Sequence, residues 1–92
     1  RYAIPVDVSG DPATELSRVL ATRARAMVPS GNLLVVRTGT GAAQFVAAAI
    51  DAVGDPAVAG SVAGDDTIIV VAAEGHSGRD LLQTFESIGA EA

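Results

Sequence analysis

The stretch LLVVRTGTGAAQFVAAAIDAVG, residues 33–54, decides the fold because its hydrophobic period changes partway along. Residues 33–38 are an apolar run rich in β-branched side chains, which predicts a strand. After a Gly-Thr-Gly turn at residues 39–41, apolar residues recur at the i, i+3, i+4, i+7 spacing of a helix. The predicted core stripe of this helix is Ala42, Phe45, Val46, Ala49, Ile50 and Val53. Gly54 is expected to end the helix as its C-cap.

The segments before this stretch predict a partner strand and a short helix. Residues 22–29 alternate polar and apolar side chains, which is the period of a strand. A Pro-Ser-Gly-Asn turn at residues 29–32 joins them to the next strand as a hairpin. Thr14 is expected to cap a short helix that runs through about Leu20. Residues 1–12 contain two prolines and a glycine that break regular structure, so we expect a linker there.

The segments after the stretch predict a second hairpin and a last helix. Residues 57–63 and 67–73 are strand-like runs on either side of a Gly-Asp-Asp turn at residues 64–66. A Ser-x-x-Asp pattern at residues 77–80 opens a helix through a reciprocal cap, and Gly89 is expected to stop it. The order β-β-α-β-β-α predicts a two-layer α+β fold, in which two helices cover one face of a four-stranded antiparallel sheet.

Composition limits the partners that this domain can have. The 92 residues carry a net charge of −5, contain no Lys or Cys, and are 49% hydrophobic. A negative domain argues against binding of nucleic acid or anionic membranes by the domain itself. No apolar run reaches the roughly 18 residues of a membrane span, and no signal peptide is visible. The lack of Cys rules out a disulfide framework and fits the cytosol, so we expect a cytoplasmic protein. A small domain this rich in Ala and Val predicts an apolar surface that oligomerisation buries, and the uncovered sheet face is expected to carry small apolar residues for this subunit contact.

Asp65 and Asp66 stand side by side although no Lys or Arg lies between Arg37 and Arg79. Two unit charges about 4 Å apart repel by roughly 1 kcal/mol even in water. Asp is an ordinary turn residue, so a plain hairpin turn is one interpretation. The other is a site for a cation, either a metal ion or a guanidinium, whose planar fork matches a carboxylate. Further ligands for a metal are hard to find nearby, because Glu74 is the next acid.

Gln44 and Asp51 form a second polar pair. They are seven residues apart on the predicted helix and therefore lie almost on one line along its surface. That line carries only Ala47 and Ala48 between them, so the pair could hold an amine or a carboxylate on a smooth surface. Two solvated polar side chains on an outer helix face are the plainer interpretation.

No enzyme is expected from the remaining polar residues. A lone His76 forms no catalytic triad. The glycines at residues 39–41 lack the lysine of a phosphate-binding loop, so they predict a tight turn into the helix. Arg23, Arg25 and Arg37 are expected to be strand-surface charges that pair with acids of the same or a neighbouring subunit.

Two segments together resemble the C-terminal domain of the bacterial arginine repressor family: SGNLLVVRTGTGAAQFVAAAID at residues 30–51 and GSVAGDDTIIVV at residues 60–71. The resemblance extends over residues 30–88, and the second segment is the more specific. It implies trimers that pair into hexamers, with L-arginine bound where the trimers meet. Residues 1–12 would be the end of a linker from an N-terminal winged helix-turn-helix domain that binds DNA. Residues 13–92 would be the oligomerisation and arginine-binding domain of an arginine-responsive transcriptional regulator.

The resemblance also implies the residues of the arginine site: Gln44, Asp51, Ser61, Ala63, Asp65 and Asp66. Asp65, from the opposing trimer, would bind the guanidinium, and the others, with the backbone near Ala63, would hold the amino-acid end. The family usually has Thr at the position of Ser61 and Pro at the position of Thr40. L-Arginine would be an effector, and neither a cofactor nor a metal is implied.

Two other functions stay open at this point. The chain could be a constitutive oligomerisation module that does not sense arginine, or that responds to another cationic amino acid such as ornithine or lysine. It could also be an enzyme that holds Mg²⁺ on Asp65 and Asp66, but no nucleophile, base or phosphate loop accompanies these residues.

Overall fold

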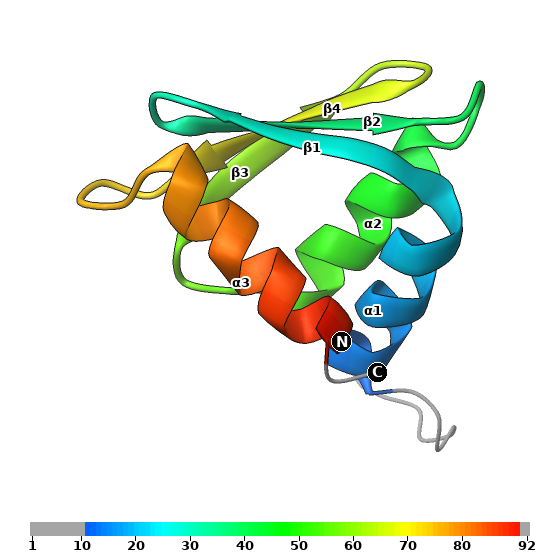
Figure 1. Cartoon of the computed structure of the whole chain (residues 1–92), viewed down its shortest axis with the longest axis horizontal. Coiled ribbons are helices and arrows are strands. Elements are labelled where there is room, and N and C mark those ends of the chain that lie inside the picture. The colour runs from blue at the N-terminus through cyan, green and yellow to red at the C-terminus, as the bar shows by residue number, and fades with distance from the viewer. Residues whose placement is uncertain (1–10, 91–92) are drawn as a thin grey trace.

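The chain folds into one layer of strands and one layer of helices (Figure 1). The computed structural model describes residues 11–90. In chain order the elements are α1 (Pro12–Arg23), β1 (Ala24–Ser30), β2 (Leu33–Thr38), α2 (Ala43–Val53), β3 (Val58–Ala63), β4 (Thr67–Ala72) and α3 (Gly78–Ala90). All three helices lie on the same face of the sheet. No helix in this range is long and apolar enough to cross a membrane.

The sheet confirms the predicted α+β class. Its four strands pair antiparallel in the order β1-β2-β4-β3, so β1 and β3 are the edge strands. The two predicted hairpins therefore meet along β2 and β4 in the middle of the sheet. Because side chains alternate across a strand, one face of these central strands points to the helices and the other points away from them.

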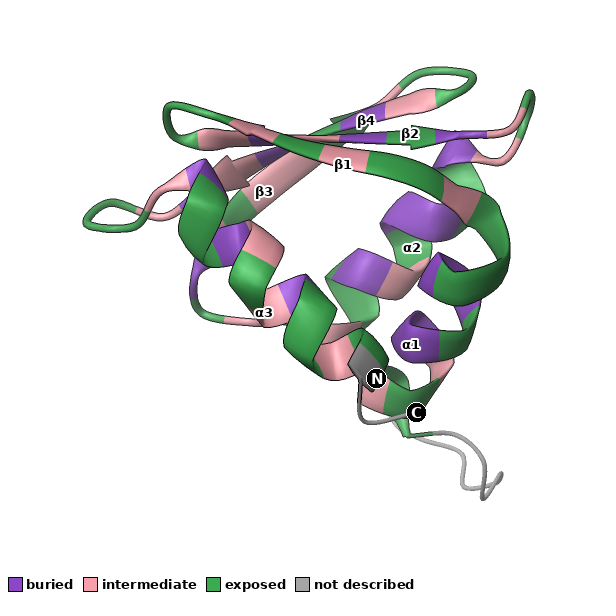
Figure 2. Cartoon of the chain, in the orientation of Figure 1, coloured by how far each residue is buried: buried purple, intermediate pink, exposed green. Residues whose placement is uncertain are grey.

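The core lies between the sheet and the helix layer, where Figure 2 places the buried segments. Its largest fully buried side chains alternate along the central strands and recur at helical spacing on the helices: Phe85, Leu16, Leu34, Ile50, Ile68, Leu81, Val36, Val46 and Val70. Burial of such a side chain contributes roughly 1.5–3 kcal/mol, so this cluster supplies most of the force that holds the two layers together.

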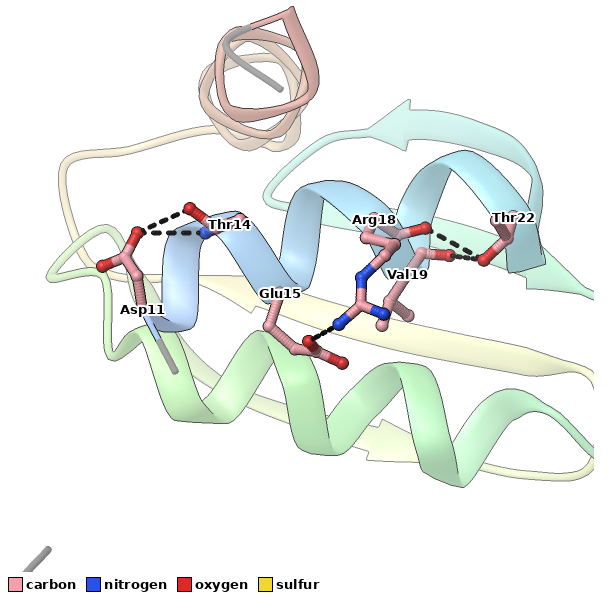
Figure 3. A network of polar contacts seen from close by, with 6 residues as sticks. All are labelled: Asp11, Thr14, Glu15, Arg18, Val19 and Thr22. Carbon is pink, nitrogen blue, oxygen red and sulfur yellow. Dashed lines mark hydrogen bonds and ion pairs between the residues drawn. The ribbon is translucent and has the colours of Figure 1, made fainter. Parts of the chain in front are cut away.

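The first helix begins earlier than the sequence predicted, because Asp11 rather than Thr14 is its N-cap. The carboxylate of Asp11 accepts hydrogen bonds from the backbone N–H of Thr14, at 3.2 Å, and from its hydroxyl, at 2.9 Å (Figure 3). Pro12 takes the first helical position, where a missing N–H costs nothing. Asp11-Pro12 thus begins a helix, and Thr14 lies inside its first turn.

The first helix also ends later than predicted, at Arg23 rather than near Leu20. The strand that was expected over residues 22–29 consequently begins at Ala24. The linker that was predicted for residues 1–12 lies outside the described residues, except for its last two, which begin α1.

Phe45 was predicted to lie in the core stripe of α2, and this was wrong. The residue is 51% exposed, and the buried positions of the helix are Ala43, Val46, Ala47 and Ile50. Phe45 is about 100° around the helix from Val46, which turns it from the sheet toward the end of α1. There the guanidinium carbon of Arg23 lies 5.1 Å from the ring centroid, so a cation–π contact covers one side of the ring.

The other predicted helix ends are largely confirmed. Gly54 ends α2 in the left-handed conformation, with φ of 64°. Ser77 and Asp80 form the reciprocal cap of α3: the Ser77 N–H donates to Asp80 at 2.9 Å, and the Asp80 N–H donates to the Ser77 hydroxyl at 3.1 Å. Gly89 does not stop this helix, which continues to Ala90, because a helical glycine costs only about 1 kcal/mol.

Gly78 brings the start of α3 against the first hairpin. Its N–H donates to the carbonyl oxygen of Gly31 at 2.8 Å. A Cβ atom at this position would lie 1.9 Å from the carbonyl oxygen of Leu33, so no other residue type fits without movement of the backbone.

Candidate functional site

Two hydrogen bonds made by polar side chains link α2 to the edge strand β3. Nε2 of Gln44 donates a hydrogen bond to the carbonyl oxygen of Ala63 at 3.1 Å. The hydroxyl of Ser61 donates to Oδ1 of Asp51 at 3.3 Å. Both contacts are exposed to solvent. We call this line of four residues (Gln44, Asp51, Ser61 and Ala63) the α2–β3 seam.

The seam follows the axis of α2. Gln44 and Asp51 are about 10 Å apart along the helix, and the exposed Ala48 lies between them. Ala47, which was expected on the same surface line, is only 7% exposed and belongs to the core. Beside Asp51 the surface is hollowed by about 280 Å³, and the lining residues are Ile50, Asp51, Gly54, Asp55, Pro56, Val58, Ala59 and Gly60. The seam therefore has polar groups at two points and an open recess at one end.

The turn between β3 and β4 carries Asp65 and Asp66 to the N-terminal end of α2. The carbonyl oxygen of Asp65 accepts hydrogen bonds from the N–H groups of Gly41, at 3.0 Å, and Ala43, at 3.2 Å. The carbonyl oxygen of Asp66 accepts from the N–H of Thr38 at 2.8 Å. The backbone of the turn is thus attached to the segment that joins β2 to α2, while both aspartates are exposed. We call Asp65 and Asp66 the acidic turn.

The acidic turn carries negative charge without a cation beside it. Within residues 11–90, neither Asp65 nor Asp66 forms an ion pair. Asp66 accepts one side-chain hydrogen bond, from the hydroxyl of Thr67 to Oδ1 at 3.0 Å. The N-terminus of α2 adds a partial positive charge nearby, which offsets two carboxylates only weakly. The turn is therefore able to bind a cation from outside the chain.

Arg23, Arg25 and Arg37 do not form ion pairs with these acids within the described part of the chain. Arg23 lies over the ring of Phe45, and the guanidinium of Arg25 approaches to 3.6 Å from the Cβ position of Gly39. Arg37 is exposed. In the described part of the chain none of the three forms an ion pair, so the predicted pairing within a subunit is not found. Pairing with a neighbouring subunit stays a prediction.

All six residues predicted for the site lie on the seam or on the acidic turn at its end. Sequence reasoning missed the hydrogen bond from the backbone N–H of Gly41 to the carbonyl oxygen of Asp65. The predicted tight turn is present, because the Ala42 N–H donates to the Gly39 carbonyl at 3.1 Å and Gly41 has φ of +81°. The pattern of glycines signals such a turn, but nothing in it signals that the turn contacts Asp65.

No metal site accompanies the acidic turn in the described residues. Within them, no group of three or more His, Asp and Glu side chains is arranged to hold an ion. A larger hollow of about 770 Å³ lies against α3 and is lined in part by His76 and Asp80, whose Nδ1 and Oδ2 atoms are 3.8 Å apart. This hollow includes no residue of the seam or of the acidic turn.

The sheet face that the helices leave uncovered carries an apolar row across all four strands. The strand register places Val28 opposite Val35, Val35 opposite Ile69, and Ile69 opposite Val62. Val28, Ile69 and Val62 are 51%, 38% and 70% exposed. We call these four residues the outer row. The sequence predicted small apolar side chains on this face; Val28, Val35 and Val62 fit that prediction, and Ile69 is larger.

These features first define a class, namely a small two-layer α+β domain with an apolar sheet face and an acidic, solvent-exposed edge. The family follows from comparison of the sequence. The profile of the family described as "Arginine repressor, C-terminal domain" matches residues 21–87. The chain belongs to this family.

Two curated relatives extend the match. The chain is 40% identical to the arginine repressor of Carboxydothermus hydrogenoformans over 87 residues, which are 94% of this chain and 58% of the relative. It is 44% identical to the arginine repressor of Symbiobacterium thermophilum over 71 residues, which are 77% of this chain and 47% of the relative. The chain thus spans about half the length of the curated relatives that it matches.

Proposed function

We propose that this chain is the effector-sensing and oligomerisation domain of an arginine-responsive transcriptional regulator. L-Arginine binds between two trimers, stabilises the hexamer and promotes operator binding by the full-length protein. The observation that carries this proposal is the acidic turn, whose carboxylates are exposed and have no cation among residues 11–90, at the end of a seam of further polar groups. Membership of the arginine repressor family supports arginine as the cation.

The seam offers complementary groups for the two ends of the ligand. The carboxylate of Asp65 has no side-chain partner in the described residues. Contributed by the opposing trimer, it accepts paired hydrogen bonds from the guanidinium of the ligand. Gln44 donates Nε2 to Ala63 and keeps Oε1 as an acceptor for the ligand's ammonium. Asp51, Ser61 and Asp66 complete the binding of the amino-acid end, together with the second lone pair of the Ala63 carbonyl.

The outer row and the acidic turn have different tasks in assembly. An apolar row on an uncovered sheet face is buried by contact between copies whether or not ligand is present, because its driving force is the removal of apolar surface from water. An acidic surface opposes contact with a second acidic surface until a cation enters. We therefore assign the outer row to contacts that form the trimer and the acidic turn to the ligand-dependent contact between trimers.

Arginine then acts on DNA binding through assembly. A ligand that binds only the assembled state favours that state by mass action. A longer-lived hexamer holds several DNA-binding domains together, so its affinity for paired operator sites rises through effective concentration. The acidic domain described here takes no direct part in contact with DNA, since its net charge is −5.

Sedimentation velocity with and without L-arginine tests the proposal. At low protein concentration the sedimentation coefficient is expected to rise from that of a trimer to that of a hexamer when arginine is added. Calorimetry with lysine, ornithine, citrulline and Mg²⁺ then separates the alternatives, because citrulline has the shape of arginine without its charge. Heat from lysine or ornithine but not arginine indicates another effector, and a stable oligomer that binds no amino acid indicates a constitutive module.

The substitution Asp65→Asn tests the assigned role of the acidic turn. It is expected to weaken arginine binding by at least about 2 kcal/mol, the scale of a charged hydrogen bond that loses one partner. Glu86→Gln is the matched control, since it removes the same charge from an exposed position on α3. Unchanged affinity in Asp65→Asn, or an equal loss in Glu86→Gln, contradicts the assignment.

A further inference from the structure

We propose that Gly41 is a positioning residue of the arginine site. Its left-handed backbone directs an N–H group at the carbonyl oxygen of Asp65, and this contact fixes the place of the Asp65 carboxylate. The inference rests on the function proposed above for the acidic turn, but the contact itself exists without ligand and is testable without it.

The first observation is that α2 has no cap from its own segment. Its N-cap residue, Ala42, makes no side-chain hydrogen bond, and its first turn contains no acidic residue. The first N–H groups of a helix have no partner within the helix and need one elsewhere. The carbonyl oxygen of Asp65 supplies it, because it accepts from Ala43 at 3.2 Å and also from Gly41 at 3.0 Å. The backbone carbonyl of Asp65 therefore does for the N-terminus of α2 what a capping side chain does in other helices.

The second observation concerns the conformation of Gly41. Its φ is +81°, and a Cβ atom built on it meets nothing within 4 Å. Glycine is therefore required by backbone conformation and not by space. A residue with a Cβ favours negative φ, and a change of φ toward that region rotates the peptide N–H away from Asp65.

The third observation concerns Asp65. Its carboxylate has no hydrogen-bond or ion-pair partner among residues 11–90, so only its backbone determines where the carboxylate stands. Besides the contacts of the Asp65 carbonyl with the N–H groups of Gly41 and Ala43, the backbone contacts of the turn are from the Thr38 N–H to the Asp66 carbonyl, at 2.8 Å, and from the Gly64 N–H to the Thr67 carbonyl, at 2.9 Å. These hold the base of the hairpin and not Asp65. A turn that is free to move at Asp65 must be ordered again when ligand binds, which lowers affinity.

The chain offers a matched control in Gly75. This glycine has φ of +88°, its Cβ position is equally open, and it lies in the connection between β4 and α3. Gly41→Ala and Gly75→Ala therefore introduce the same strain in two places. Asn accepts positive φ more readily than other residues with a Cβ, so Gly41→Asn is the conservative variant.

The first measurement is amide hydrogen exchange of the ligand-free protein. Gly41→Ala is expected to accelerate exchange at Ala43 by about tenfold, because strain in the left-handed region is released by breaking the contact with Asp65. Gly75→Ala is expected to leave the exchange of Ala43 unchanged, and Gly41→Asn to restore most of the protection. If the Ala43 amide of Gly41→Ala exchanges at the same rate as in the wild-type protein, the inference is overturned, whether or not the protein binds arginine.

The second measurement is the affinity for L-arginine by calorimetry. Gly41→Ala is expected to bind about tenfold more weakly and Gly41→Asn within about threefold of wild type, while Gly75→Ala binds as wild type. Equal losses in Gly41→Ala and Gly75→Ala overturn the positioning role, as does failure of Gly41→Ala to fold while Gly75→Ala folds. Absence of arginine binding by the wild-type protein contradicts the proposed function instead, and the exchange data then decide the role of Gly41.

Discussion

Replacement of Gly78 by Ala is expected to force α3 away from the first hairpin. The added Cβ would lie 1.9 Å from the carbonyl oxygen of Leu33, 2.7 Å from its carbonyl carbon and 3.2 Å from the nitrogen of Ser30. Ordinary contact begins at 3.4 Å, so the oxygen and the new methyl group must separate by about 1.5 Å, the difference between 3.4 and 1.9 Å. All three atoms belong to the backbone, and none can swing aside as a side chain does.

The free energy of unfolding is expected to fall by about 2–4 kcal/mol. Movement of α3 breaks the hydrogen bond from the Gly78 N–H to the Gly31 carbonyl, which contributes about 1 kcal/mol. Overpacking of a well-packed contact costs a further 1–3 kcal/mol or so, since nearby buried residues of α3 such as Leu81 shift with the helix.

Gly89→Ala provides the control, because it makes the same substitution in the last turn of the same helix. Its Cβ position is open, so it is expected to stabilise the protein by up to about 1 kcal/mol. Denaturant unfolding measures both variants, at one fixed protein concentration so that assembly does not alter the comparison. A loss below about 0.5 kcal/mol in Gly78→Ala, or the same sign in both variants, refutes the packing argument.

Two further substitutions address the exposed surfaces. Val62→Lys places a charge in the outer row and is expected to dissociate the oligomer at protein concentrations where the wild type remains assembled. Ser87→Lys on α3 is the control and is expected to remain assembled. If all three proteins sediment alike, the assignment of the outer row to subunit contacts is contradicted. Arg23→Ala is expected to lower the free energy of unfolding by about 0.5–1 kcal/mol through loss of the contact with Phe45. Arg18→Ala, which loses only an exposed pair with Glu15, should cost less in the same unfolding assay, and an equal or larger cost would argue against the cation–π contact.

The elements that were predicted correctly are those whose signals are local. The change from a strand run to a helical period near residue 40 places β2 and α2, since the two periods differ. Gly54 and the Ser77–Asp80 cap mark helix ends through contacts only a few residues long. The grouping of the site residues came from a resemblance over two segments, which carries tertiary information that single residues do not.

The errors arose where two local signals compete or where packing decides. Asp11 and Thr14 are both good N-caps, and Asp-Pro reads equally as a turn or as a cap followed by a first helical residue. Phe45 fits the apolar period of α2, but its angle on the helix and the nearby Arg23 place it in a cation–π contact at the surface. The contact between Gly41 and Asp65 joins residues 24 positions apart, and no periodic pattern encodes it.

The arrangement of the two surfaces gives the proposed regulation its direction. Burial of the outer row removes apolar surface from water and brings no charges together, so we expect contact through it to form in the absence of ligand. Approach of two acidic turns concentrates carboxylates and removes water from them, so their repulsion grows as the contact tightens. In the proposed site an arginine bridges them, with its guanidinium on Asp65 of one trimer and its amino-acid end on the other, and this reverses the sign of the electrostatic free energy of contact where the surrounding dielectric is lowest. Arginine binding and the pairing of trimers must then strengthen each other equally, because the coupling of two equilibria is reciprocal.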